Sequence, residues 1–203
     1  VEFDMRSVAD ISDLHTVYGD RLAVVHGDAL KTDITTLTPK PRAIVSNLPY
    51  NISTVLLVKW LEQIRTDHST INFMTLMFQK EVADRLLASP HSKTYGRLTV
   101  MAQWLCTLKK LFELPPSAFT PPPKIKSTVL QFTPKILPAN APSFATMEII
   151  LASAFNQRRK MIRSSLSNYA AAVEAANIDP TLRAEDVPVE DFIRLALCVE
   201  GKV

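Results

Sequence analysis

Glycine is scarce in this chain, and its distribution excludes one common kind of loop. The 203 residues include four glycines and no G-x-G sequence; the glycines are Gly19, Gly27, Gly96 and Gly201. Nucleotide-binding α/β folds usually open on a strand followed by a glycine-rich loop, because a backbone without side chains can approach the ligand closely. Either that loop lies upstream of Val1 or the protein has none.

Cysteines and long apolar runs are also few. Cys106 and Cys198 lie in the apolar strings QWLCTL and LALCVE, which predicts buried free thiols rather than a disulfide or a metal pair. Free thiols suit a reducing cytosol. The sequence shows no basic-then-apolar leader and no apolar run near the ~20 residues needed to span a bilayer. We therefore expect a cytoplasmic protein that contacts no membrane and holds no metal.

Charge is present in quantity but is unevenly placed. The chain carries a net charge of +3, to which residues 1–92 contribute −2, residues 93–163 contribute +9 and residues 164–203 contribute −4. The central block is the candidate surface for a polyanion. A solvated face of ordinary lysines is the alternative.

The sequence AIVSNLPYNIS, at residues 43–53, joins a strand-like run to a polar turn. Its first three residues are apolar and largely β-branched, which is typical of a buried parallel strand. Leu48 before Pro49 then requires an extended turn, since the residue before a proline is pushed out of the helical region. Asn47 and Tyr50 would thus lie at the carboxyl end of a strand, where open α/β sheets bind ligands.

The chemistry of this turn suits an adenine amino group, which is a poor nucleophile because its lone pair is delocalised into the ring. The side-chain oxygen of Asn47 and the carbonyl of Leu48 would accept from the two N–H groups and favour a pyramidal nitrogen. Tyr50 offers a face for base stacking, worth roughly 1–3 kcal/mol. We take Asn47, Leu48, Pro49 and Tyr50 as the catalytic candidates. A plain strand-to-helix turn with Ser53 as N-cap is the alternative.

The string NLPYNIS resembles motif IV of the S-adenosylmethionine-dependent adenine-N6 methyltransferases, in the form seen in the rRNA adenine dimethyltransferases. Other strings match that family in order, namely VEFD, GDAL, FQKEVADRL, YGRLTV, FTPPPK and FNQRRKMIR. The resemblance implies an α/β, Rossmann-like S-adenosylmethionine-dependent methyltransferase fold, incomplete at the N-terminus, with a small all-helical C-terminal domain. Residues 1–134 would form the catalytic domain, and residues 135–203 the helical domain that contacts rRNA.

Two upstream strings carry the cofactor residues that the resemblance implies. VEFD resembles motif II, which implies Glu2 for the ribose of S-adenosylmethionine and Phe3 for packing on its adenine. VHGDAL resembles motif III, which implies Asp28, with Ala29 beside it, for the adenine amino group; Asn47 completes the set. From the residues alone, Glu2 is equally a solvated glutamate and Asp28 a turn aspartate.

The absent glycine-rich loop bears on this cofactor set. Because the other strings match the family in order, we expect a truncated chain whose first strand, first helix and N-terminal arm are missing. Such a chain would bind S-adenosylmethionine poorly or not at all.

Several basic segments resemble RNA-contacting parts of the family. FTPPPKIKST resembles the segment that lines the target-base pocket, which makes Phe119 a second stacking residue beside Tyr50. FNQRRKMIRSSL resembles a C-terminal signature, and its dense like charges are unfavourable unless a polyanion answers them. The candidate RNA-binding residues are Lys93, Arg97, Lys124, Lys126, Arg158, Arg159, Lys160 and Arg163. As an alternative, Lys124 and Lys126 are ordinary solubilising lysines.

Hydrophobic periodicity predicts the elements. Helices are expected over residues 5–18, 53–65, 79–88, 145–169 and 189–199, and strands over residues 22–26, 43–45, 71–78, 105–114 and 127–132. Gly19 would end the first helix. The last two strands should form an antiparallel hairpin, with Lys109 and Lys110 protecting its edge.

The resemblance implies an enzyme that dimethylates N6 of two adjacent adenosines in small-subunit rRNA, with S-adenosylmethionine as methyl donor; we expect the truncated chain itself to be inactive. Its expected partners are small-subunit rRNA and the precursor small ribosomal subunit, and we expect a monomer. Two alternatives stay open. One is a large-subunit rRNA methyltransferase of the kind that confers macrolide resistance. The other is a non-catalytic RNA-binding, ribosome-binding or transcription factor that shares the fold.

Overall fold

The computed structural model describes residues 1–202, and its centre is a four-stranded mixed sheet with the order β1-β2-β4-β3. The strands are β1 (Ala43–Asn47), β2 (Phe73–Gln79), β3 (Cys106–Leu114) and β4 (Ser127–Pro134). Strands β1 and β2 are parallel, whereas β4 is antiparallel to both β2 and β3. The predicted hairpin of β3 and β4 is confirmed, and β3 is the edge strand on which Lys109 and Lys110 are exposed.

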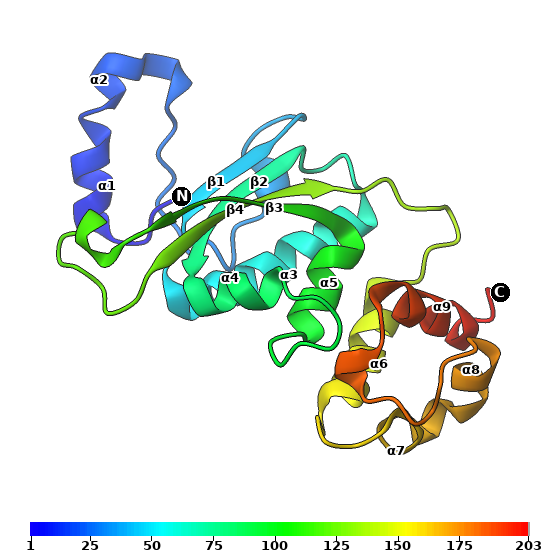
Figure 1. Ribbon diagram of the computed structural model, residues 1–203. Helices are drawn as coiled ribbons and strands as arrows, with labels where there is room; N and C mark the ends of the chain where they lie inside the picture. The colour runs from blue at the N-terminus through cyan, green and yellow to red at the C-terminus, as the bar shows by residue number, and fades with distance from the viewer. Residues whose placement is uncertain (203) are drawn as a thin grey trace.

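Three helices lie along one face of the sheet (Figure 1). They are α3 (Tyr50–Thr66), α4 (Lys80–Leu86) and α5 (Arg97–Leu105). Helix α3 connects the parallel strands β1 and β2, as a parallel pair requires. Its fully buried Leu57 and Leu61 share one core with Leu76 of β2 and Phe132 of β4. The helix therefore fixes the turn that precedes it against the sheet.

The C-terminal part is helical and packs on α5. Its helices are α6 (Phe144–Phe155), α7 (Ile162–Ser165), α8 (Ala170–Ala175) and α9 (Val189–Val199). The Trp104 ring of α5 stacks on Phe144 with 6.4 Å between centroids, and Phe155 lies 5.7 Å from Phe192 by the same measure. The chain leaves the sheet at Pro134, and the division into domains at that residue stays a prediction.

The N-terminal part projects away from the sheet (Figure 1). It contains α1 (Met5–Ser12), α2 (His15–Tyr18) and the 3-10 helix η1 (Gly19–Arg21). The 3-10 helix η2 (Ile34–Thr36) does not project, because its Ile34 packs against the core. The predicted helix over residues 5–18 is thus interrupted near residue 13, and Gly19, with φ of 53°, follows α2. Within the described chain, every residue before Leu48 is at least partly exposed. These helices consequently contribute little to the core.

One strand prediction is wrong, and a second is right about the strand but wrong about its burial. Residues 22–26 form no strand, and only an isolated parallel bridge joins Glu2 to His26. A strand in a parallel sheet needs a neighbouring strand along its length, and this segment pairs with a neighbour at one residue alone. Strand β1 was predicted to be buried, but its Val45 is 75% exposed. The reason is its position, because β1 is an edge of the sheet that the described residues form.

Two helix predictions also need correction. The helix predicted over residues 145–169 ends at Phe155, and residues 156–160 form turns, consistent with the repulsion of crowded like charges in a helix. Helix α3 begins at Tyr50, so Ser53 is not an N-cap; its hydroxyl donates to the Tyr50 carbonyl at 3.1 Å. Helix α9 has the predicted bounds.

The structure also tests the predictions about the two cysteines and about membrane-spanning segments. Cys106 and Cys198 are both free; Cys106 is buried, as predicted, and Cys198 is half-buried. No helix within residues 1–202 is long and apolar enough to cross a membrane.

Candidate active site

Four strand ends meet at one edge of the sheet. The parallel strands β1 and β2 end on Asn47 and Gln79, so their carboxyl ends lie together. Ser127, the first residue of β4, pairs with Gln79 on one side and with Leu114, the last residue of β3, on the other. This edge therefore carries both the turn after β1 and the proline-rich loop at residues 115–126.

The four predicted catalytic residues form the turn between β1 and α3. Asn47 is exposed, Leu48 is 5% exposed, and Pro49 is the extended N-cap of α3 with φ of −56° and ψ of 130°. Tyr50 is half-buried, and its hydroxyl lies 2.8 Å from the Ser127 hydroxyl. Among the described residues, no hydrogen bond occupies the Asn47 side-chain oxygen or the Leu48 carbonyl. The exposed Asn47 can offer its oxygen to an incoming amine, whereas Leu48 is buried as a whole.

The predicted cofactor residues Glu2 and Asp28 are brought together by the short parallel bridge, since Glu2 pairs with His26, two residues before Asp28. One Glu2 carboxylate oxygen accepts two backbone N–H groups at 2.8 Å. Asp28 Oδ1 accepts one at 2.9 Å. Each carboxylate keeps its second oxygen for a ligand, and this pair of acceptors fits the ribose hydroxyls and exocyclic amine of a nucleoside, which donate. Phe3, predicted to pack on the adenine, is 73% exposed.

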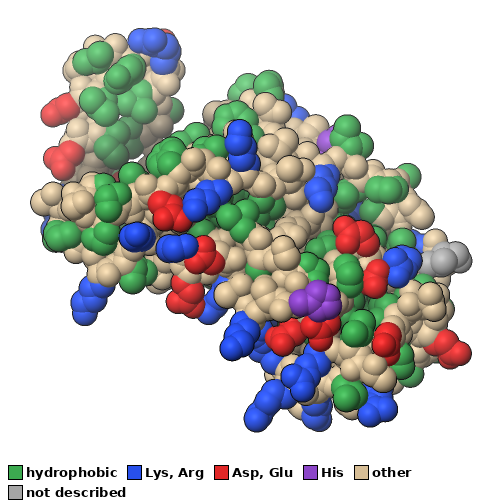
Figure 2. Space-filling model, in the orientation of Figure 1, with side chains coloured by type: hydrophobic (Ala, Val, Ile, Leu, Met, Phe, Trp, Pro, Cys, Tyr) green, Lys and Arg blue, Asp and Glu red, His purple; other side chains and the backbone are tan. Residues whose placement is uncertain are grey.

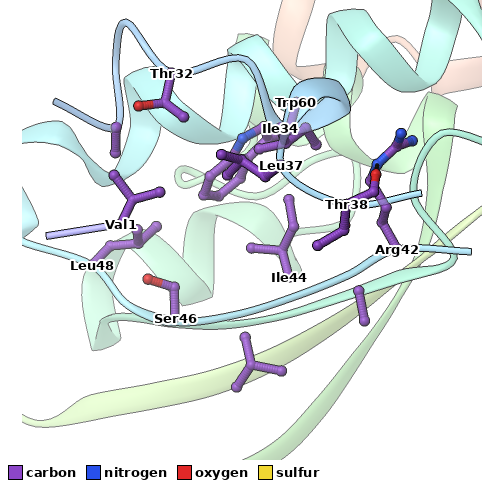
Figure 3. A pocket seen from close by; sticks show the side chains of 13 residues that line it. Val1, Thr32, Ile34, Leu37, Thr38, Arg42, Ile44, Ser46, Leu48 and Trp60 are labelled. Atoms are coloured by element: carbon purple, nitrogen blue, oxygen red, sulfur yellow. Dashed lines mark hydrogen bonds between the residues drawn. The ribbon is translucent and has the colours of Figure 1, made fainter. Parts of the chain in front are cut away.

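A cavity of about 320 Å³ lies between β1 and residues 29–42 (Figure 3). Ala29 of the predicted cofactor set and Leu48 of the catalytic turn both line it. Its walls are mainly apolar, and the buried indole N–H of Trp60 finds no acceptor within residues 1–202. Glu2, Asp28, Asn47 and Tyr50 do not line it, so the cavity touches each predicted group at one residue.

Phe119, the predicted second stacking residue, lies in the proline-rich loop at the same edge of the sheet. It is half-buried, and its backbone N–H donates to the Pro116 carbonyl at 3.2 Å. The aromatic pairs in the described part of the chain do not include Phe119 with Tyr50. A joint stacking role for the two rings stays a prediction.

The predicted RNA-binding residues fall into separate groups. Lys93, Arg97 and Arg158 line one cavity of about 350 Å³ together with Tyr95 and Phe155. Lysine and arginine side chains also gather near the connection of α6 and α7 (Figure 2). The exposed basic residues there are Arg158, Arg159 and Lys160 of the connection and Arg163 of α7. The exposed Lys124 and Lys126 lie instead in the proline-rich loop at residues 115–126, at the end of the sheet where β1 and β2 finish.

Arg158 makes contacts that the sequence around it does not predict. Its guanidinium donates to the Lys93 carbonyl at 2.6 Å and to the Glu185 carboxylate at 2.9 Å. The buried Tyr95 hydroxyl donates to the Val187 carbonyl at 3.0 Å, and burial raises the pKa of this phenol. These bonds join the loop before α5 to the C-terminal helices. RNA binding by Arg158 stays a prediction.

Sequence reasoning missed two residues that support the site. Ser127 contacts Tyr50 across 77 positions of the chain. Lys59 of α3 donates to the carbonyls of Leu30 and Thr32 at 2.8 Å and 2.7 Å, and so holds the loop after Asp28 against the helix. No local pattern announces either contact, because both partners are distant in sequence.

Comparisons of sequence identify the family. Residues 1–200 match the family model described as ribosomal RNA adenine dimethylase. The chain is 45% identical over 204 residues to "Ribosomal RNA small subunit methyltransferase A" of Rhodospirillum rubrum, covering 99% of this chain and 69% of that protein. It is 47% identical over 198 residues to the protein of the same name from Gluconobacter oxydans, covering 97% and 64%. The chain is thus shorter than these relatives.

Comparisons of structure agree. A crystal structure of a dimethyladenosine transferase from Plasmodium falciparum matches with a TM-score of 0.78 and 25% identity, covering 99% of this chain and 81% of that one. The 23S rRNA methyltransferase ErmE matches with a TM-score of 0.64 and 23% identity, covering 98% and 80%, which shows the fold alone. The chain therefore has the Rossmann-like methyltransferase fold and belongs to the ribosomal RNA adenine dimethylase family.

Proposed function

We propose that the site of this chain serves methyl transfer from S-adenosylmethionine to N6 of two adjacent adenosines in small-subunit rRNA. The observation that carries the proposal is the turn at the carboxyl end of β1. There, the side-chain oxygen of Asn47 and the carbonyl of Leu48 are both unoccupied in the described chain, and Tyr50 lies beside them. Family membership supports the same chemistry.

The residues of the turn would act on the target amine. S-Adenosylmethionine, when bound, supplies a methyl group that its sulfonium already activates. Asn47 and the Leu48 carbonyl accept from the two N–H groups of the adenine, which localises the lone pair on nitrogen and stabilises charge as it develops. Tyr50 stacks on the ring of a base that has left its helix. Glu2 and Asp28 hold the nucleoside part of the cofactor.

The proposed substrate is an RNA in its ribosomal setting. Exposed basic residues near the catalytic edge and near the α6–α7 connection would contact phosphates as charges, without reading sequence. The proposed partners are small-subunit rRNA and the precursor small ribosomal subunit, met by a monomer in the cytoplasm. The names of the relatives from Rhodospirillum rubrum and Gluconobacter oxydans support the small subunit.

Replacing Tyr50 by alanine tests this proposal. Loss of one base stack should lower methyl transfer roughly 5- to 150-fold, whereas RNA affinity, spread over many phosphate contacts, should change much less. Methyl groups on the rRNA are measured by mass spectrometry of its nucleosides after incubation with S-adenosylmethionine and unmethylated small subunits. Tyr18→Ala is the matched control, because Tyr18 is 48% exposed and lies in α2, away from the turn.

The assay separates the proposal from its competitors. Calorimetry with S-adenosylmethionine first shows whether the chain binds the cofactor. A chain that binds both cofactor and rRNA but transfers no methyl group would be a non-catalytic RNA-binding factor. Methylation of large subunits in place of small ones would contradict the proposed substrate. Equal loss of transfer and RNA affinity in Tyr50→Ala would contradict the role of Tyr50.

A further inference from the structure

Two hydroxyl groups from distant parts of the chain meet beneath the catalytic turn. The Tyr50 hydroxyl lies 2.8 Å from Ser127 Oγ, and Ser127 is fully buried. A buried hydroxyl without a partner destabilises the fold, because it has lost its hydrogen bonds to water. Tyr50 is the partner that the described residues give to the Ser127 hydroxyl. The bond is therefore costly to break from either side.

Ser127 is held in place by the strands around it. It pairs with Gln79 of β2 and with Leu114 of β3, so the backbone at this point has neighbours on both sides. The backbone N–H of Lys80 also donates to the carbonyl of Lys126, at 2.9 Å. Because its backbone is fixed, the Ser127 hydroxyl cannot move with the tyrosine ring if the ring rotates.

Tyr50 is consequently held at both ends. Its backbone begins α3, and its carbonyl accepts from the Ser53 hydroxyl at 3.1 Å. Its hydroxyl is held by Ser127. A ring held at one end alone would sample several orientations, and each binding event would then have to select the one that matches the base.

We infer that Ser127 is a positioning residue, whose hydroxyl fixes the Tyr50 ring in the orientation that receives the target adenine. The inference rests on the proposed function, because it needs a base that stacks on Tyr50. It also gives the tyrosine hydroxyl a role. A phenylalanine would offer the same aromatic face but would leave Ser127 unpaired. Ser127 itself contacts neither base nor cofactor in this account.

The test measures stacking directly and needs no methyl transfer. A short single-stranded RNA with one 2-aminopurine is titrated with the chain, and the quenching of the probe reports stacking on an aromatic ring. Ser127→Ala and Tyr50→Phe should each weaken the stacked state roughly three- to tenfold, the effect of one lost hydrogen bond. The double variant should lose no more than either single variant, because both remove the same bond.

Thr128→Val is the matched control. Thr128 is the next residue of β4, it is 1% exposed, and its hydroxyl finds no partner within residues 1–202. Valine keeps its shape, so quenching should stay at the level of the unaltered chain. If Ser127→Ala retains full quenching as Thr128→Val does, the inference is overturned. If Ser127→Ala does not fold by circular dichroism, Tyr50→Phe removes the same bond from a half-buried site and decides the matter.

Tyr50→Ala distinguishes failure of the inference from failure of the proposed function. Loss of quenching in Tyr50→Ala but not in Ser127→Ala would overturn only the positioning role. Unchanged quenching in Tyr50→Ala would show that the base does not stack on Tyr50, and would overturn the proposed role of Tyr50 together with the inference.

Discussion

Helices α1 and α9 have similar amphipathic sequences but very different surroundings. Helix α9 buries Phe192 and Leu195 completely, whereas α1 has no buried side chain among the described residues. Helix α9 packs on α5, α6 and α8, whereas α1 packs mainly on α2. The comparison teaches that an apolar stripe predicts a helix, but burial depends on a partner surface.

Local interactions are what hold α1. Asp4 caps its N-terminus by accepting from the Arg6 backbone N–H at 2.9 Å, and the same carboxylate pairs with the Arg6 guanidinium. Hydrogen bonds from the Arg6 side chain and backbone lower the pKa of Asp4, whose side chain is 42% exposed. Isolated helices of this length are marginal in water. Helix α1 should therefore be the less stable member of the pair.

Truncating a side chain in each region should give the largest difference in the free energy of unfolding between α9 and α1. Phe192→Ala should lower the free energy of unfolding by about 3–5 kcal/mol, since it removes a buried ring and leaves a cavity. Leu14→Ala, at a 47% exposed residue between α1 and α2, should change it by less than about 0.5 kcal/mol. Urea unfolding followed by circular dichroism measures both. Similar losses would mean that residues 1–42 unfold with the core.

Hydrogen exchange should show the same difference without mutation. Amides of α1 should exchange with opening free energies near zero, while those of α9 should approach the stability of the whole protein. Mass spectrometry of exchange at neutral pH resolves the two segments by peptide. Equal protection of α1 and α9 would contradict the comparison and point to a partner surface for α1.

Helices and strands were predictable from the sequence where a regular apolar pattern packs on a neighbouring surface in the fold. Helix α9 has the predicted residues, because a regular apolar stripe follows Pro188 and finds the core. Residues 22–26 have an equally good strand pattern but form only a bridge at His26, because pairing is a property of neighbours. The break after Phe155 was missed, since the periodicity continues through the charged residues that disrupt it.

The candidate site was predictable in its motifs and not in its contacts. The turn at Asn47 to Tyr50 lies at the end of a strand as predicted, because proline restricts the residue before it. The bond from Tyr50 to Ser127 and that from Arg158 to Glu185 join residues far apart in sequence. Such contacts depend on how strands and helices pack, which no single stretch encodes.

The ion pair that joins the C-terminal helices to the loop before α5 should contribute only modestly to the stability of the protein. Arg158 and Glu185 are 51% and 26% exposed, so their coupling should be at most about 1 kcal/mol and should weaken with salt. A double-mutant cycle of Arg158→Ala and Glu185→Ala, measured by urea unfolding at two salt concentrations, gives this energy. No corresponding pair ties α1 to the sheet in the part of the chain described. Strict additivity of the two substitutions would show that the pair does not stabilise the joint.

At neutral pH the smallest expected effect on stability concerns the cysteines of the well-packed region. Burial raises the pKa of Cys106 to about 12, so the folded protein keeps this thiol protonated while the unfolded chain ionises near 9. The unfolded state therefore binds fewer protons above pH 9, and the stability that this thiol contributes is lost as the pH rises from about 9 towards 12. At pH 8 iodoacetamide should modify the half-buried Cys198 in the native protein and should reach Cys106 only after unfolding, as mass spectrometry of the labelled peptides would show. Rapid native labelling of Cys106 would mean that β3 opens from the sheet as readily as α1 is expected to unfold, and the contrast between the two regions would then be lost.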